Sequence, residues 1–138
     1  MKARTYLGRP YAEMDCITLI MKIIRNAYGG IPGYRDAGTN DLWRSRTRSG
    51  KYRHLTETYE GLENVRAGYL VFKSRDSKDP RFDGTDIHHV GLVTPEGTVI
   101  HSSSVSGKVV EEQLSAAKGW TLCARHRYII PGKENPIK

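Results

Sequence analysis

The residue types best suited to covalent chemistry in this sequence are a cysteine near the start of the chain and two histidines in its second half. Cys16 directly follows Asp15, a good helix N-cap, and opens an apolar segment predicted to form a helix from Cys16 to about Tyr28. The positive end of a helix dipole favours the thiolate, the nucleophilic form of cysteine. Cys16 is therefore a candidate nucleophile, although a lone cysteine on an apolar helix is more often a core residue.

A predicted hairpin carries the two histidines that could supply a base for this thiol. Residues Ile87 to Val93 and Thr98 to Ser103 flank Pro95-Glu96-Gly97, a sequence typical of a three-residue turn closed by a left-handed glycine. Closing this loop between Thr94 and Thr98 fixes the strand register.

In this register His89 and His101 are diagonal neighbours on one face of the hairpin, because Gly91 lies opposite His101. Gly91 would leave space there for an imidazole or for a substrate backbone. The other face then carries the apolar side chains of Val90, Leu92 and Ile100. The hairpin thus separates a polar, histidine-bearing face from a core face.

A thiol, an imidazole and a third polar group that orients the imidazole form the general layout of cysteine acyl-transfer catalysis. In this interpretation His89 takes the thiol proton and later gives it to the leaving amine, while His101 orients the ring of His89. The competing interpretation is that both histidines are ordinary hydrogen-bonded strand residues. The residues alone leave both interpretations open.

A metal site is a less favoured interpretation of the same region. The potential ligands are Asp86, His88, His89, His101 and Cys16. Adjacent histidines in a regular strand point to opposite faces, so His88 and His89 are poorly placed to bind one ion. No spacing matches a zinc motif, and Gly29-Gly30 lacks the context of a phosphate-binding loop. We therefore expect neither a metal nor a cofactor.

Length and composition predict a single domain covering residues 1–138. No apolar run reaches transmembrane length, and the start of the chain lacks the apolar stretch of a signal peptide, so synthesis in the cytoplasm is expected. The formal charge of +7 would attract polyanions such as nucleic acid, anionic lipid or an anionic wall polymer. Cys16 and Cys123 are too few for a disulfide framework, and we expect two free thiols.

Turn-forming residues divide the rest of the chain into an irregular half and a strand-rich half. The first half is predicted to contain a lead-in from Met1 to Glu13, a loop from Gly30 to Gly38, a short helix from Thr39 through Arg44, and a basic run from Arg44 to Arg53. The second half is predicted to contain a strand from Tyr69 to Lys73, a charged loop from Ser74 to Asp86, a strand or short helix from Lys108 to Leu114, and a last strand from Thr121 to Ile130. These elements predict an α+β domain.

Four short motifs occur in an order that resembles the NlpC-type cell-wall cysteine peptidases, a family with a compact papain-like fold. The motifs are Met14-Asp15-Cys16, Ala67-Gly68-Tyr69-Leu70-Val71-Phe72, His89-Val90-Gly91-Leu92 and Val99-Ile100-His101-Ser102. The resemblance spans roughly Tyr6 to Tyr128, and the segment from Gly38 to Arg44 is also similar to variants encoded by phages and prophages.

The resemblance implies a papain-like α+β fold, with the nucleophile helix packed on an antiparallel sheet that carries the histidines. It implies Cys16 as nucleophile, His89 as base and His101 as orienting residue, with Tyr11 and Asp15 supporting the substrate or the oxyanion. It also implies hydrolysis of amide bonds in bacterial peptidoglycan stem peptides, as by a phage lysin or a tail-associated enzyme acting at the cell wall. The expected partners are stem peptides, anionic wall polymers and phage particle proteins, without specific nucleic acid.

The chain departs from the family pattern around the nucleophile and in the substrate subsites. Ile17-Thr18 stands where the family usually has Ser-Gly, the usual Trp-Gly-Gly before the cysteine is missing, and Tyr69 replaces a frequent aspartate. Two other functions therefore stay open. One is a papain-like amidase or acyltransferase acting on another amide or ester, and the other is a catalytically silent module that binds polyanions through its basic run.

Overall fold

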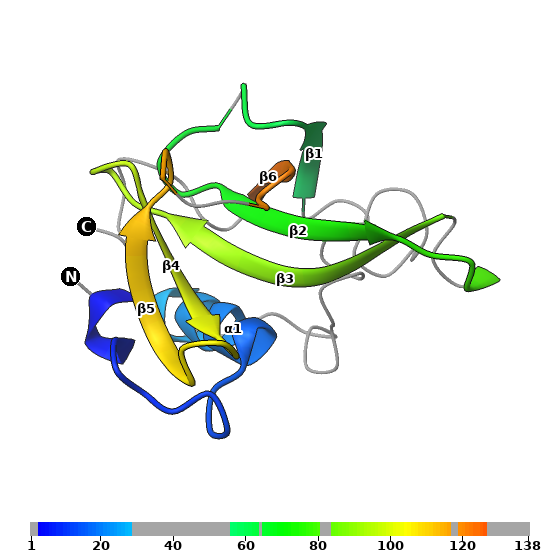
Figure 1. The fold of residues 1–138 in the computed structure, drawn as a ribbon. Coiled ribbons are helices and arrows are strands. Elements are labelled where there is room, and N and C mark those ends of the chain that lie inside the picture. Colours follow the sequence, from blue (N-terminus) through cyan, green and yellow to red (C-terminus); the bar gives the residue numbers. More distant parts are fainter. Residues whose placement is uncertain (1–2, 29–55, 64, 81–83, 117–118, 127–138) are drawn as a thin grey trace.

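The computed structural model describes residues 3–28, 56–63, 65–80, 84–116 and 119–126, with the backbone alone for 24–28, 56–60 and 126. In this part of the chain one short 3-10 helix and one α-helix precede the strands (Figure 1). The elements are η1 (Ala3–Tyr6), α1 (Cys16–Tyr28), β1 (Thr56–Glu60), β2 (Leu70–Asp76), β3 (Thr85–Val93), β4 (Thr98–Ser103), β5 (Lys108–Gln113) and β6 (Leu122–His126).

The strands form a six-stranded sheet in the order β1-β6-β2-β3-β4-β5. Every neighbouring pair is antiparallel, and α1 packs on β3 and β4 from one face of the sheet (Figure 1). The prediction of an α+β domain with a helix on an antiparallel sheet is therefore confirmed. Within the described residues, no helix combines the length and the apolar character needed to cross a bilayer.

Helix α1 begins where the sequence predicts, because Asp15 caps it. The backbone amide of Thr18 donates to Asp15 Oδ1 at 2.9 Å, which satisfies one of the free amides of the first turn. Ile20 and Ile23 are buried together with Cys16, and Lys22 is exposed, as the helical spacing predicts. The predicted inward positions of Ile24 and Ala27 and the outward positions of Arg25 and Asn26 lie outside the described side chains.

The sheet has a core on each face. On the helix side, α1 packs on apolar side chains of the sheet, which are Leu70, Phe72, Ile87, Val90, Leu92, Ile100, Val109 and Ala124. On the opposite side lies a smaller group, which is Val71, Val93, Val99, Trp120 and Cys123. The predicted free thiols are confirmed, since both cysteines are free and each lies in a different core.

The hairpin between β3 and β4 has the predicted turn and register. The Thr94 amide donates to Thr98 O at 2.9 Å, and Gly97 has the left-handed φ of 78° that closes a three-residue loop. The ladder continues through Val93↔Val99. Because this register is fixed at the turn, the side chains of β3 and β4 fall on the faces that the sequence predicts.

Several predicted boundaries were wrong. The charged segment from Ser74 to Asp86 is a loop only in its middle, because β2 continues to Asp76 and β3 starts at Thr85, with Arg75 Nη2 paired to Asp86 Oδ2 at 2.9 Å across the two strands. A cross-strand ion pair of this kind lets a polar segment extend a sheet beyond its apolar core.

Other differences concern elements without a strong apolar pattern. The lead-in contains the 3-10 helix η1, the segment predicted as strand or helix is strand β5, and β6 is shorter at its start than predicted. Strand β1, whose sequence is Thr-Glu-Thr-Tyr-Glu, was not predicted because a polar edge strand has no apolar alternation. The predicted loop from Gly30 to Gly38, the helix from Thr39 through Arg44, the basic run from Arg44 to Arg53, and the end of the last strand lie outside the described residues.

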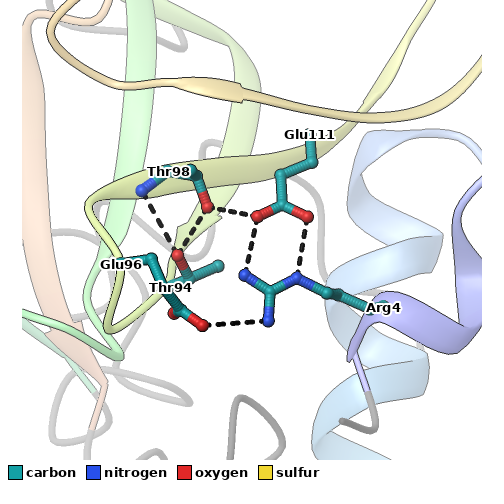
Figure 2. A network of polar contacts seen from close by, with 5 residues as sticks. All are labelled: Arg4, Thr94, Glu96, Thr98 and Glu111. Carbon is teal, nitrogen blue, oxygen red and sulfur yellow. Dashed lines mark hydrogen bonds and ion pairs between the residues drawn. The ribbon is translucent and has the colours of Figure 1, made fainter.

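An arginine joins η1 to the β4–β5 hairpin on the helix side (Figure 2). The Arg4 guanidinium donates to both carboxylate oxygens of Glu111, at 2.8 and 2.7 Å, and to Glu96 at 3.2 Å. The Thr98 hydroxyl also donates to Glu111, and a further hydroxyl contact joins Thr98 to Thr94. We call this set of five residues the Arg4 network, and it fixes the first helical turn of the chain to the end of the sheet.

The segment after η1 then runs along β5. The Gly8 amide donates to Val109 O and the Val109 amide donates to Arg9 O, each at 2.9 Å. The Tyr11 amide donates to Gly107 O, also at 2.9 Å. These bonds place the lead-in beside the edge strand and deliver the chain to the start of α1.

Candidate active site

Strands β3 and β4 separate close to the two histidines. Their ladder runs from the turn only as far as Leu92↔Ile100. Hydrogen-bonded pairs recur at every second position of an antiparallel ladder, so the next such pair would be Val90↔Ser102. That pair is not part of the ladder between these two strands. The backbone of Val90 and the side chain of Ser102 instead meet another element.

The start of α1 contacts both strands beyond the end of this ladder. The Val90 amide donates a hydrogen bond to Cys16 Sγ, and the buried Ser102 hydroxyl donates to Met14 O. The thiol therefore lies against the backbone of the residue that directly follows His89. Cys16 belongs to the helix-side core, whereas the His89 ring stacks on Trp120 of the opposite core, so the thiol meets β3 at the backbone of Val90.

The two predicted histidines form a direct pair. His89 Nε2 lies 2.7 Å from His101 Nδ1, and the ring centroids are 4.8 Å apart at an interplanar angle of 78°. The predicted diagonal neighbours on one face are thus confirmed, and the remaining ring nitrogen of His89 is Nδ1. The catalytic roles of Cys16, His89 and His101 stay predictions.

Glu112, which was not predicted from the sequence, extends the pair to a third member. Its Oε1 lies 2.7 Å from His101 Nε2, and its side chain is 43% exposed at the rim of the sheet. Glu112 is two positions from Val110, the partner of His101 in the β4–β5 ladder. Recognising it would have required the register of β5, which the sequence left open between strand and helix.

Trp120, just before β6, was also missed. Its buried indole stacks on His89, with centroids 5.3 Å apart and planes at 25°, and meets His101 edge-on at 5.1 Å. A Cβ at Gly91 would lie 3.1 Å from the Trp120 ring and 2.6 Å from Val99 Cγ2. The space above Gly91 is therefore filled by Val99, Trp120 and the histidine His101, and the predicted alternative of a substrate backbone at this place is wrong.

Burial keeps both imidazoles neutral. Burial, followed by the charges of His101, Lys73 and His88, lowers the pKa of His89 from 6.5 to about 3. Burial also lowers the pKa of His101, and this effect exceeds the opposing effect of Glu112. At neutral pH each ring therefore carries one proton, on one nitrogen.

The thiolate expected at the helix start is not the resting form. Burial raises the pKa of the Cys16 thiol above its ordinary 9.0, and this effect exceeds the hydrogen bonds from the Val90, Ile17 and Cys16 amides, which lower it. The nearby Asp15 carboxylate raises it further. The resting forms of Cys16 and His89 are thus a thiol and a neutral imidazole, because the loss of solvation outweighs the amides at the helix start.

Tyr11 and Asp15 both lie within electrostatic range of the thiol. Burial raises the pKa of the Tyr11 phenol, and the charges of Cys16 and Asp15 raise it further. Oδ1 of Asp15 accepts the hydrogen bond that caps α1. The structure therefore gives Asp15 a positioning contact at the helix start and places Tyr11 beside the site.

The prediction that His88 and His89 point to opposite faces assumed regular alternation along the strand, and β3 is not regular at this place. The β2–β3 register shifts between Lys73↔His89 and Ser74↔Ile87, so β3 has an extra residue at His88 and simple alternation does not hold there. His88 is nevertheless exposed, whereas His89 is only partly exposed and contacts His101 and Trp120. In the described part of the chain no group of three potential ligands is placed to hold a metal ion.

No protein-family model matches this chain, and no curated protein matches it. The resemblance to the NlpC-type peptidases therefore depends on the ordered motifs.

Proposed function

We propose that this protein is a papain-like cysteine hydrolase that cleaves amide bonds in bacterial peptidoglycan stem peptides. The observation that carries this proposal is the contact of Cys16 Sγ, at a helix start, with the amide of Val90, the residue that directly follows His89, whose ring is hydrogen-bonded to His101. A nucleophile, a base and an orienting group are the three parts that thiol acyl transfer requires.

The neutral resting pair defines the proposed first step. His89 Nδ1 accepts the proton from Cys16 Sγ while sulfur forms a bond to the carbonyl carbon of the scissile amide. The carbonyl electrons move to oxygen, and the positive end of the α1 dipole favours negative charge near the helix start. His89 then gives its proton to the leaving amine as the C–N bond breaks, which leaves a thioester.

The second half of the reaction uses the same groups. His89 Nδ1 accepts a proton from water as the water oxygen bonds to the thioester carbon. The C–S bond then breaks, the acid product leaves, and the proton returns to sulfur, so the thiol and the neutral imidazole are restored. His101 supports both halves by holding the ring of His89 through the 2.7 Å contact.

Two observations support a cell-wall substrate. The motif order resembles that of wall peptidases, including phage and prophage variants, and a formal charge of +7 favours association with an anionic wall. We propose stem peptides as the substrate, anionic wall polymers as accessory partners, and the cell wall or a phage particle as the place of action.

Mass spectrometry of peptides released from purified bacterial walls tests the proposal. We expect release by the wild type and by Cys123→Ala, whose thiol lies in the opposite core, and none by Cys16→Ala. Activity that survives in Cys16→Ala would disprove the nucleophile assignment. Intact walls, combined with thiol-dependent hydrolysis of a simple amide or ester, would instead support an amidase or acyltransferase.

A further inference from the structure

The contacts of His89, His101 and Glu112 determine where the ring protons lie. An ionised carboxylate can only accept hydrogen bonds, and the half-exposed position of Glu112 lets solvent support its charge. His101 Nε2, 2.7 Å from Glu112 Oε1, must then be the protonated nitrogen of that ring. In a neutral imidazole the other nitrogen is an acceptor, so His101 Nδ1 carries no proton.

The unprotonated Nδ1 of His101 in turn determines which nitrogen of His89 carries the proton. His101 Nδ1 accepts the short hydrogen bond from His89, so His89 Nε2 is the donor. His89 is neutral, and its Nδ1 therefore carries a lone pair and no proton. This is the nitrogen that accepts the thiol proton in the proposed reaction.

We propose that Glu112 is a positioning residue that acts through His101 to set the tautomer of His89 with an unprotonated Nδ1. The effect of Glu112 on catalysis rests on the proposed function, whereas its effect on the tautomer of His89 is a property of the resting protein. Without the carboxylate the chain of hydrogen bonds can reverse. His101 Nδ1–H would then donate to His89 Nε2, and the proton of His89 would move to Nδ1, where it blocks the base.

The other groups near the two histidine rings do not select between the tautomers. Lys73 Nζ lies 4.8 Å from the centre of the Trp120 ring, and its charge lowers the pKa of both histidines, which favours neutral rings without selecting a tautomer. His88 acts on His89 in the same direction. The Trp120 indole covers one face of His89 and contributes no hydrogen bond to either ring. The Cys16 thiol accepts its hydrogen bond from the Val90 amide, which is part of the backbone of β3.

Nitrogen-15 NMR of histidine-labelled protein at neutral pH tests the proposal without any substrate. In the wild type we expect His89 and His101 to be Nε2–H tautomers. In Glu112→Ala we expect a substantial fraction of Nδ1–H in both rings. Glu112→Gln should lie between the two, because its amide can either accept or donate.

Glu111→Gln is the matched control, since Glu111 is the preceding residue on β5 but bonds Arg4 and Thr98. Its tautomers should equal those of the wild type, with circular dichroism confirming the fold of every variant. An Nδ1–H proton on His89 in the wild type, or unchanged tautomers in a folded Glu112→Ala, would overturn the proposal.

Kinetics on a stem peptide provides the second measurement. We expect kcat of Glu112→Ala to fall roughly 10- to 100-fold, less than the loss expected for removal of the base, with little change in KM. The acid limb of the pH profile should move to lower pH, because Glu112 raises the pKa of His101. If the tautomers are as predicted but the protein hydrolyses no substrate, the proposed function alone is refuted. If the protein is active but its tautomers do not change in Glu112→Ala, this inference alone is refuted.

Discussion

Two consecutive glutamates of β5 belong to networks of opposite character. Glu111 pairs with the Arg4 guanidinium on the helix side, where opposite charges meet and the pKa of the Glu111 carboxyl is lowered. Glu112 bonds the buried His101 ring on the other side, where the partly buried His89 ring stacks on the Trp120 indole. In the Arg4 network each charge is stabilised, whereas in the histidine network protonation of either ring is opposed.

This difference suits the Arg4 network to the structural role of a joint and the histidine network to the proposed role of His89 as a proton acceptor. A joint needs groups whose protonation does not change near neutral pH, and an arginine with two carboxylates meets that need. An acyl-transfer base needs a ring that is neutral at rest and charged only during the reaction. The two networks share strands β4 and β5, so alternation along a strand is enough to keep the functions apart.

The largest effect is expected from removing the base of the histidine network. His89→Ala should lose roughly 100- to 10,000-fold in kcat on a stem peptide, while His101→Gln should retain measurable activity because an amide or water can partly orient the ring. Rates with circular dichroism as a fold control measure this. An active, folded His89→Ala would contradict the assignment of the base.

Removing the joint should reduce stability and leave the chemistry intact. Arg4→Ala breaks a bidentate pair with Glu111 that is partly open to solvent, and we expect a loss of about 1–2 kcal/mol in the free energy of unfolding. Urea denaturation measures the loss, and Arg4→Lys should recover part of it. A large fall in kcat with unchanged stability would mean that the joint also acts on the site.

The two networks should also respond to acid in different ranges. The folded pKa values of His89 and His101 lie below the unfolded value of 6.5, so the unfolded chain binds more protons as pH falls. Stability present above pH 6.5 should therefore be lost progressively toward the folded pKa of His89, which is about 3. The contribution of Glu111, whose folded pKa is also lowered, is lost only as pH falls below its unfolded value of 4.5.

Urea denaturation at about pH 7 and about pH 5 separates these ranges. The fall in unfolding free energy between the two values should be smaller in the double variant His89→Gln, His101→Gln than in the wild type. In Arg4→Ala the unfolding free energy should decrease between these two pH values by the same amount as in the wild type. An equal fall in the wild type and the histidine variant would mean that folding does not shift the pKa values of the two rings.

The smallest effect is expected at the exposed histidine. His88→Ala should have nearly wild-type activity, since the side chain is exposed, and the extra residue in β3 does not alter the pairing of His89 with Lys73. An inactive but folded His88→Ala beside an active His89→Ala would move the site by one residue. Rates for both variants in one assay decide between these outcomes.

The parts of this arrangement that the sequence could predict are those set by local physics. Asp15 caps α1 and Gly97 closes the hairpin, and these two short-range signals determine the start of the helix and the register of His89 with His101. Glu112 and Trp120 could not be placed, because their contacts depend on the register of β5 and on the path of the chain into β6. The neutral resting form of Cys16 could not be predicted either. The helix dipole that favours a thiolate is a local effect, whereas the burial that opposes it depends on the whole fold.

The contacts at the start of α1 also determine when the site can form during synthesis. The groups that hold the nucleophile come from far along the chain: Ser102 is 88 residues beyond Met14, and Trp120 follows later still. At about 5–20 residues per second, roughly 5–20 s separate the appearance of Cys16 from that of Trp120 on the ribosome. A nascent chain thus carries an unplaced thiol for most of its synthesis, and the hydrolase proposed here would become active only after nearly all of the described chain has been made.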